Sequence, residues 1–449
     1  MTDAVTNPAQ NTGPAPMQPS ALTKRRYAAE RRFKAYGVGA VAIGVIALLL
    51  LLTSILSRGL PAFTQTFIRA DIYLAPQVLD PKGNRDRDDI AKVMTFSYTP
   101  LIKDSLASLA EELKDGPVPQ ATPALLAGMV SGAANAQLRD YVLAHPDEIG
   151  KTVAFEFLAN ARIDQYLKGN VTRESAAADS KVDPTQLDIA DALVKQGIMS
   201  KRFNPAFITN PDASENRPEA AGLGVALLGS AYMMLIVLVL SLPIGVAASI
   251  YLEEFAPKNW ITDVIEVNIS NLAAVPSIVF GILGLAIFIN FMHLPNSAPI
   301  VGGLVLTLMT LPTIIISTRA SLKSVPPSIK EAALGVGASK MQSIFHHVLP
   351  LAMPGILTGT IIGLAQALGE TAPLLLIGMV AFVRDYPGPL PGGLLDPATG
   401  LPVQVYNFTQ RADPAFVERA SGAIIVLLAF LVVMNAIAIF LRQRLERTW

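Results

Sequence analysis

The sequence predicts an all-α polytopic membrane protein with six transmembrane helices and a mainly helical extracytoplasmic insert between the first and second helices. Three observations support this prediction. Of the 449 residues, 51% are hydrophobic and only 16% are charged, whereas soluble domains average about 25% charged residues. Long apolar runs with few charges lie within residues 36–56 and 222–441. Residues 58–220, in contrast, hold 18 of the 35 basic and 22 of the 35 acidic residues, a composition that favours water.

Six stretches have the length and composition of membrane spans. A helix needs about 20 mostly apolar residues to cross the hydrocarbon core of a bilayer. The stretches are residues 36–56, 224–250, 270–292, 299–318, 354–383 and 421–441. Any one of them is compatible with a buried helix of a soluble core, but six of this length favour the membrane.

The basic residues predict the direction of each span, because cytoplasmic loops carry an excess of Lys and Arg. With the N-terminus inside, the predicted cytoplasmic segments hold fourteen basic residues, six of them before the first span. The short outer loops 293–298 and 384–420 hold only Arg384, Arg411 and Arg419. We therefore expect both termini in the cytoplasm and the insert outside it.

This orientation divides the chain into five parts. They are a disordered basic cytoplasmic tail (1–35), transmembrane helix 1 (36–56), a periplasmic insert (57–221), a transmembrane domain (222–441) that contains a cytoplasmic loop (326–350), and a short cytoplasmic tail (442–449).

Composition and missing motifs argue against several functions. The formal net charge is zero, so no general attraction to nucleic acid is expected. The sequence has no cysteine, no phosphate-binding G-x-x-x-x-G-K-[ST] loop, and no nucleophile-elbow or metal-ligand spacing. We therefore predict no catalytic residue, no metal site and no ATP hydrolysis by this chain alone.

The loop between spans four and five, residues 326–350, predicts a helical hairpin. Ser328 and Glu331 have the S-x-x-E spacing of a capping box, which indicates a helix start directly after two prolines. Gly335 and Gly337 are expected to end this helix, because glycine adopts the left-handed conformation of a helix end at low cost.

A second short helix follows in the same loop. Ser339 and Gln342 repeat the capping pattern, and Leu349-Pro350 is expected to end the helix. The first helix is expected to expose a flat surface at Ala332 and Ala333 beside one carboxylate, where a partner protein can approach closely.

The run Glu331-Ala332-Ala333-x-x-x-Gly337, followed by Leu349-Pro350, resembles the EAA loop of ABC importer permeases. The resemblance implies the type I importer transmembrane fold. It also implies that these residues seat in a groove of a separate cytoplasmic ATPase, which binds ATP-Mg, and couple ATP hydrolysis to transport. This chain would then carry no cofactor of its own. It departs from the family at His347, where an aliphatic residue is usual.

Span five contains an ionisable residue, Glu370. A charge at the centre of a membrane helix costs about 3 kcal/mol on insertion scales, so such residues usually face the bundle interior and serve a function. At about 1.5 Å per residue from Pro354, Glu370 is expected roughly 24 Å along the helix. Gly369 and Pro373 flank it and indicate a bend or break. Two roles remain open, one in the transport pathway or gate and one in a structural pair with another helix.

Two segments resemble PstA-type phosphate ABC transporter permeases. One is Gly369-Glu370-Thr371-Ala372-Pro373, and the other is the Val-Pro-Ser-Ile-Val run at 275–279, which contains Pro276 and Ser277. The resemblance implies a substrate pathway or gate at Glu370, Thr371, Gln366, Pro276 and Ser277. Many relatives have arginine where this chain has Gln366, so an anion-attracting charge at that position is not implied.

The resemblance implies a permease subunit of an ATP-driven phosphate importer in the inner (plasma) membrane. The expected partners are a second homologous permease subunit, a cytoplasmic ABC ATPase dimer, a periplasmic phosphate-binding protein and the lipid bilayer. Two alternatives remain: a permease for sulfate or molybdate, and a membrane receptor whose insert is a sensor. Glu253 and Glu254 are expected on a solvated face, and Thr310 and Ser317 are expected to bond within their own helix or to a neighbouring one.

Overall fold

The computed structural model describes residues 21–114, 118, 120–177, 182–379 and 382–445. It is mainly helical, which confirms the predicted fold class. Two compact units divide the chain, one up to Ser54 and one from Ile55 onward. The run Gly116-Pro117-Val118-Pro119 is typical of a turn, but it falls almost entirely outside the described residues.

Helix α1 (Ala21–Gly59) contains the first predicted span. Large apolar side chains between Val38 and Leu56 are exposed, as expected for a helix surrounded by lipid. The helix starts well before the predicted span. Residues 21–35 are therefore helical, and their assignment to a disordered tail was wrong.

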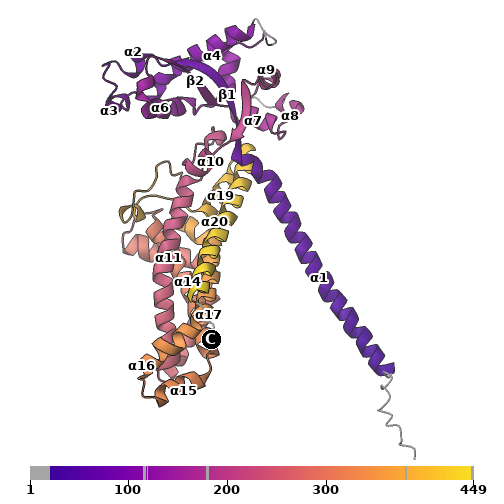
Figure 1. Cartoon of the computed structure of the whole chain (residues 1–449), viewed down its shortest axis with the longest axis vertical. Coiled ribbons are helices and arrows are strands. Elements are labelled where there is room, and N and C mark those ends of the chain that lie inside the picture. The colour runs from indigo at the N-terminus through magenta and orange to yellow at the C-terminus, as the bar shows by residue number, and fades with distance from the viewer. Residues whose placement is uncertain (1–20, 115–117, 119, 178–181, 380–381, 446–449) are drawn as a thin grey trace, which may run out of the picture. The chain divides into compact units, whose positions relative to one another are not determined.

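Three further spans agree with the sequence prediction. They are α11 (Gly224–Ile250), α14 (Pro299–Ser324) and α20 (Ala415–Leu445). Within the described residues, five helices are long and apolar enough to cross a membrane, and a sixth span is formed if one bent pair is counted as a single crossing. Figure 1 shows α11, α14, α17 and α20 running side by side.

The third predicted span, 270–292, is not a single helix. It consists of α12 (Trp260–Ala273) and α13 (Ser277–Gly284), whose axes differ by 102°, followed by a π-helical turn at Leu285–Phe291. Pro276 explains the break, because its ring forces the preceding residue out of the helical conformation and it has no N–H to donate. Apolar periodicity alone does not reveal the break.

The fifth predicted span, 354–383, also ends early. Helix α17 (Leu349–Gly369) stops before Glu370, whose backbone is extended, and a short helix α18 (Ala372–Leu376) follows. Pro373 lies in the first turn of α18, where its missing N–H costs nothing. Glu370 therefore lies at a helix break, which confirms the bend or break expected from Gly369 and Pro373.

The insert contains a three-stranded antiparallel sheet that the sequence analysis did not anticipate. Its strands are β1 (Thr64–Tyr73), β2 (Thr152–Leu158) and β3 (Met199–Phe203), in the order β2-β1-β3. The alternating apolar residues Val153, Phe155 and Phe157 were the available signal, because successive strand side chains point to opposite faces.

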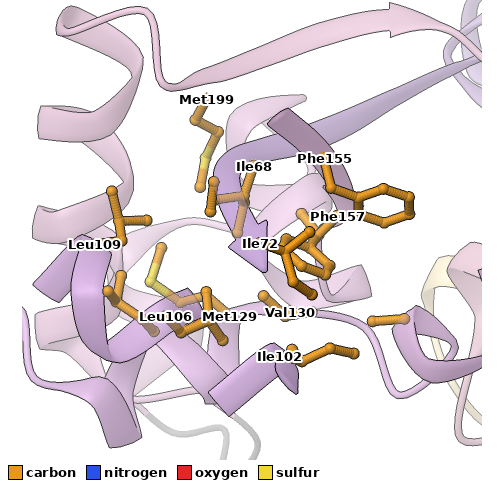
Figure 2. Packing of buried hydrophobic residues seen from close by; sticks show 14 of the residues in the cluster. Ile68, Ile72, Ile102, Leu106, Leu109, Met129, Val130, Phe155, Phe157 and Met199 are labelled. Carbon is orange, nitrogen blue, oxygen red and sulfur yellow. The ribbon is translucent and has the colours of Figure 1, made fainter. Parts of the chain in front are cut away.

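Helices pack around this sheet, in agreement with the prediction of a mainly helical insert. The longer ones are α4 (Thr99–Lys114), α5 (Pro123–Met129), α6 (Ala134–Ala144), α7 (Ala161–Leu167) and α9 (Pro184–Lys195). The shorter ones are α2 (Pro76–Leu79), α3 (Arg87–Ile90), α8 (Arg173–Ala177) and α10 (Ala206–Thr209). Figure 2 shows part of the shared core, in which Ile68 and Ile72 of β1 lie among side chains of the helices such as Leu106.

Buried ion pairs fasten the insert to the start of α20. Lys168 Nζ lies 2.7 Å from both Asp164 Oδ2 and Glu418 Oε1, and none of these three side chains is more than 4% exposed. Gln165 Nε2 donates to Glu418 Oε2 at 2.7 Å. Arg162 pairs with Asp413 at 3.1 Å. Removing one partner of a buried pair typically costs 3–5 kcal/mol, so these contacts fix where the insert sits on α20.

Arg419 makes a second connection between α20 and the insert. Its guanidinium donates to Gln65 Oε1 at 2.6 Å, to the Glu219 carbonyl at 2.9 Å and to the Ala62 carbonyl at 3.3 Å. It also lies 5.0 Å from the centre of the Phe207 ring. Arg419 thus holds three separate segments of the insert at one point.

The carboxyl group of Glu219 gives this junction a pH dependence. Burial raises its pKa above the ordinary value of 4.5, although Ser131 donates a hydrogen bond to it. The folded state therefore holds this proton more tightly than the unfolded state. The stability it contributes is complete below about pH 4.5 and is lost as the pH rises through the raised pKa.

We predict that Glu219→Gln raises the thermal stability of the insert at pH 8 and reduces its dependence on pH. The reason is that glutamine keeps an acceptor for Ser131 without a buried charge. Limited proteolysis of residues 60–221 in the full-length protein over a temperature ramp at pH 5 and pH 8 measures this. Glu215→Gln, an exposed neighbour, is the control. A Glu219→Gln protein with the pH dependence of the wild type would contradict the prediction.

Candidate functional site

The predicted hairpin forms, with one change at its start. Helix α15 (Pro327–Gly335) begins with Pro326 as N-cap and without a side-chain cap, so Ser328 lies inside the first turn and the predicted capping box with Glu331 was wrong. Gly337 has φ +92°, the left-handed conformation expected at the turn. The capping box of Ser339 and Gln342 at the start of α16 (Lys340–Ser343) is confirmed.

The second arm of the hairpin does not end at Leu349-Pro350. Helix α16 passes through a π-helical turn at Ile344–Val348 directly into α17, so residues 340–369 form one apolar helix of 30 residues. Pro350 lies directly after the π-helical turn, where the regular hydrogen-bond ladder of the α-helix is already interrupted. A displacement of the hairpin therefore acts directly on the span that leads to Glu370.

The hairpin surface is only partly the one expected. Glu331 and Ala332 are exposed, as expected. Ala333, however, is only 7% exposed and packs inward, so the prediction that it forms part of the exposed surface was wrong. The turn instead exposes apolar side chains of larger size, namely Leu334, Val336, Met341 and Phe345. Val336 is 87% exposed. An exposed apolar group of this kind, beside a carboxylate, is typical of a surface that binds a protein partner.

Acidic residues at the end of α11 hold the hairpin in place. A π-helical turn, Tyr251–Phe255, extends α11, and its Glu254 pairs with Lys330 of α15. Glu253 lies 3.3 Å from Arg319 and 3.4 Å from Lys323, both on α14. The expectation of a solvated face for Glu253 and Glu254 was therefore wrong.

The insert and the hairpin lie at opposite ends of α11. The helix starts at Gly224, directly after the insert, and its 27 residues extend about 40 Å before the turn that carries Glu254. Figure 1 shows α15 and α16 at the end of the bundle away from the insert. The predicted topology requires this arrangement, although which end faces the cytoplasm stays a prediction.

The two helix breaks are brought together by α13 and α18. A side chain at Gly281 would place its Cβ 2.7 Å from Pro373 Cα and 2.9 Å from the Pro373 carbonyl oxygen, so only glycine allows this approach. Phe280 of α13 is buried in the same cluster as Leu374 and Ile377. The segments 275–281 and 369–373, far apart in the sequence, therefore form one packed unit.

The predicted pathway residues lie around this unit. Gln366, on the last turn of α17, and Pro276 are exposed, whereas Glu370, Thr371 and Ser277 are partly buried. Within the described part of the chain, no residue hydrogen-bonds to or ion-pairs with the Glu370 carboxylate. The structure therefore favours neither the pathway role nor the structural-pair role of Glu370.

The hydroxyl groups of span four bond within their own helix. Thr310 Oγ1 donates to the Leu306 carbonyl at 2.9 Å, and Ser317 Oγ donates to the Ile314 carbonyl at 3.0 Å. Ser249 was not predicted to bond between helices, yet its hydroxyl donates from α11 to the Ile315 carbonyl of α14 at 3.1 Å. Arg319, one of the basic residues that predict the topology, also bonds two carboxylates, those of Glu253 and Glu266.

We predict that Gly281→Ala lowers the free energy of unfolding by about 1–3 kcal/mol, the usual cost of overpacking, because Pro373 presents backbone that cannot move aside cheaply. Thermal unfolding of the purified protein in detergent measures the loss. Gly369→Ala is the matched control, since a Cβ at Gly369 meets no atom within 4 Å. Equal stability of the two variants would show that α13 and α18 do not pack as described.

The chain resembles known transport proteins over its C-terminal half. The family described as "Binding-protein-dependent transport system inner membrane component" matches residues 241–449, and a domain of unknown function, DUF3333, matches residues 20–177. The chain is 33% identical to the probable ABC transporter permease protein YqgI of Bacillus subtilis over 230 residues, which are 49% of this chain and 78% of the relative.

Two relatives are named as phosphate permeases. The phosphate transport system permease protein PstA of Yersinia pestis is 31% identical over 49% of this chain and 73% of its own length. The PstA protein of Xylella fastidiosa (strain Temecula1) is 31% identical over 51% of this chain and 78% of its own length. The hairpin, the apolar spans and these relatives together show that the chain belongs to the PstA-like family of ABC transporter permeases, with an added N-terminal domain.

Proposed function

We propose that this chain is the permease subunit of an ATP-driven importer of inorganic phosphate. The observation that supports this most is the contact of Gly281 with Pro373, which joins the two segments that resemble phosphate permeases. The PstA proteins of Yersinia pestis and Xylella fastidiosa are named phosphate transport permeases, which supports the same substrate.

In this proposal the chain forms half of the transmembrane pathway, and a second homologous permease forms the other half. A cytoplasmic ABC ATPase dimer binds ATP-Mg and contacts the coupling loop 326–350. A periplasmic phosphate-binding protein delivers the substrate. Both termini lie in the cytoplasm, the insert 57–221 lies in the periplasm, and the domain 222–441 crosses the inner membrane.

Glu370 then serves in substrate selection. Phosphate carries O–H donors at neutral pH and can donate to a carboxylate, whereas sulfate is fully ionised and cannot. A carboxylate in the pathway therefore favours phosphate by leaving sulfate repelled and without a hydrogen bond. The helix breaks beside Glu370 and Pro276 support this role, because interrupted membrane helices leave backbone groups available to bind substrate.

We predict that Glu370→Gln lowers phosphate uptake by roughly tenfold or more, since a hydrogen bond to a charged group contributes about 1.5–3 kcal/mol. Uptake of labelled phosphate, sulfate and molybdate in cells lacking the natural gene measures this, with complex assembly checked by co-purification. Asp385→Asn, an exposed acid of the outer loop, is the control. Unchanged phosphate uptake by Glu370→Gln would exclude this role. Sulfate or molybdate uptake without phosphate uptake by the wild type would favour the alternative substrates.

We also predict that Gly337→Val separates ATP hydrolysis from transport. A β-branched residue at φ +92° is strained by roughly 1–2 kcal/mol, which distorts the turn that carries the exposed apolar residues. We expect phosphate uptake to fall several-fold while the complex idles or hydrolyses ATP without transport. Gly335→Ala, at a glycine with no atom within 4 Å of an added Cβ, is the control. Full transport by Gly337→Val would contradict the role of the hairpin.

A further inference from the structure

Helix α12 packs against α14 and makes one ion pair with it. None of its residues is buried, and its apolar side chains such as Trp260 and Val267 are more than half exposed. Its Glu266 Oε1 lies 2.7 Å from Arg319 Nη2 on α14. Among the described residues, this is the one polar side-chain contact between α12 and another helix.

Arg319 is well placed to join three helices. Its Nε lies 3.3 Å from Glu253 Oε2 at the end of α11, while its Nη2 bonds Glu266 on α12. The Arg319 side chain is 16% exposed and the Glu266 side chain 37%, so the contact is partly shielded from water. The other cations of this region, Lys323 and Lys330, pair with Glu253 and Glu254 and reach only α11.

The two ends of this connection lead to the two parts of the candidate site. Helix α14 ends at Ser324, and the coupling hairpin begins at Pro327. Helix α12 turns at Pro276 into α13, which packs against α18 directly after Glu370 and Thr371. Besides the continuous helix 340–369, a second path from the hairpin to the helix break therefore passes through Arg319 and Glu266.

We propose that Arg319 and Glu266 form a positioning pair that transmits movement of the coupling hairpin to α12 and α13, and thereby to the break at Glu370. Apolar contacts between membrane helices allow sliding, because lipid competes with them equally well. A charge-assisted hydrogen bond of 2.7 Å fixes both the distance and the register of α12 on α14. This proposal rests on the proposed transport function, but it does not depend on which anion is carried.

The test uses the complete complex of both permeases and the ATPase in proteoliposomes. Glu266→Gln removes the charge that bonds Arg319 and leaves the Glu253 contacts intact. Asp263→Asn is the matched control, because it removes one exposed carboxylate from the same helix and has no ion pair among the described residues. Arg319→Gln and the double variant complete a double-mutant cycle.

Two readouts separate the positioning role from a purely structural one. The first is phosphate uptake per ATP hydrolysed. The second is the distance between spin labels at Ile278 on α13 and Leu428 on α20, with and without trapped nucleotide. Both positions are more than 40% exposed, and the chain has no natural cysteine, so cysteines introduced there are the only labelled sites in this subunit.

We expect Glu266→Gln to assemble and hydrolyse ATP, to transport about tenfold less phosphate per ATP, and to lose most of the nucleotide-dependent change in label distance. The double variant should lose no more than the single variants, and Glu266→Asp should restore part of the coupling. Label movement of wild-type size in Glu266→Gln, or an equal loss in Asp263→Asn, would overturn the proposal. If the wild type moves with nucleotide but carries no phosphate, the proposed substrate fails and the positioning pair stands.

Discussion

The approach of α13 to α18, where Gly281 leaves room for the backbone of Pro373, is the contact on which the transmembrane site depends. A membrane offers no water to satisfy backbone groups, so an interrupted helix is tolerated only where protein or an aqueous cavity surrounds the break. Among the described residues, the breaks at Pro276 and at Glu370 belong to a single packed unit. Under the proposed function, backbone groups at these breaks and the Glu370 carboxylate are available to the substrate.

The hairpin is connected to this unit by two routes of different physical kind. One route is covalent and stiff, because residues 340–369 form a continuous helix from the hairpin to the break at Glu370. The other runs through charges, from α14 across Arg319 to Glu266 on α12. In the proposed mechanism, these two routes converge on one contact, so that a movement at the hairpin shifts both sides of the break together.

The insert is attached to the end of the helix bundle by buried polar contacts. The side chains of Lys168, Glu418 and Arg419 are buried, and each has a polar partner across the junction. A movement of the insert relative to α20 would leave these charges buried without partners, which is costly in free energy. A sensor that swings freely on a linker would place these charges in water. The insert instead fixes the start of α20, and the raised pKa of Glu219 makes that junction more stable as the pH falls.

The sequence by itself determined which segments enter the membrane, where the coupling hairpin lies, and which family motifs the chain carries. These properties follow from local apolar length, glycine and proline placement, and charge distribution, which are written in consecutive residues. Only the tertiary structure decided that span three is broken at Pro276, that Gly281 meets Pro373, and that Arg319 connects Glu253 and Glu266 by ion pairs. The reason is that these features depend on distances between helices, and the sequence pattern of each helix is the same whether or not its partner is near.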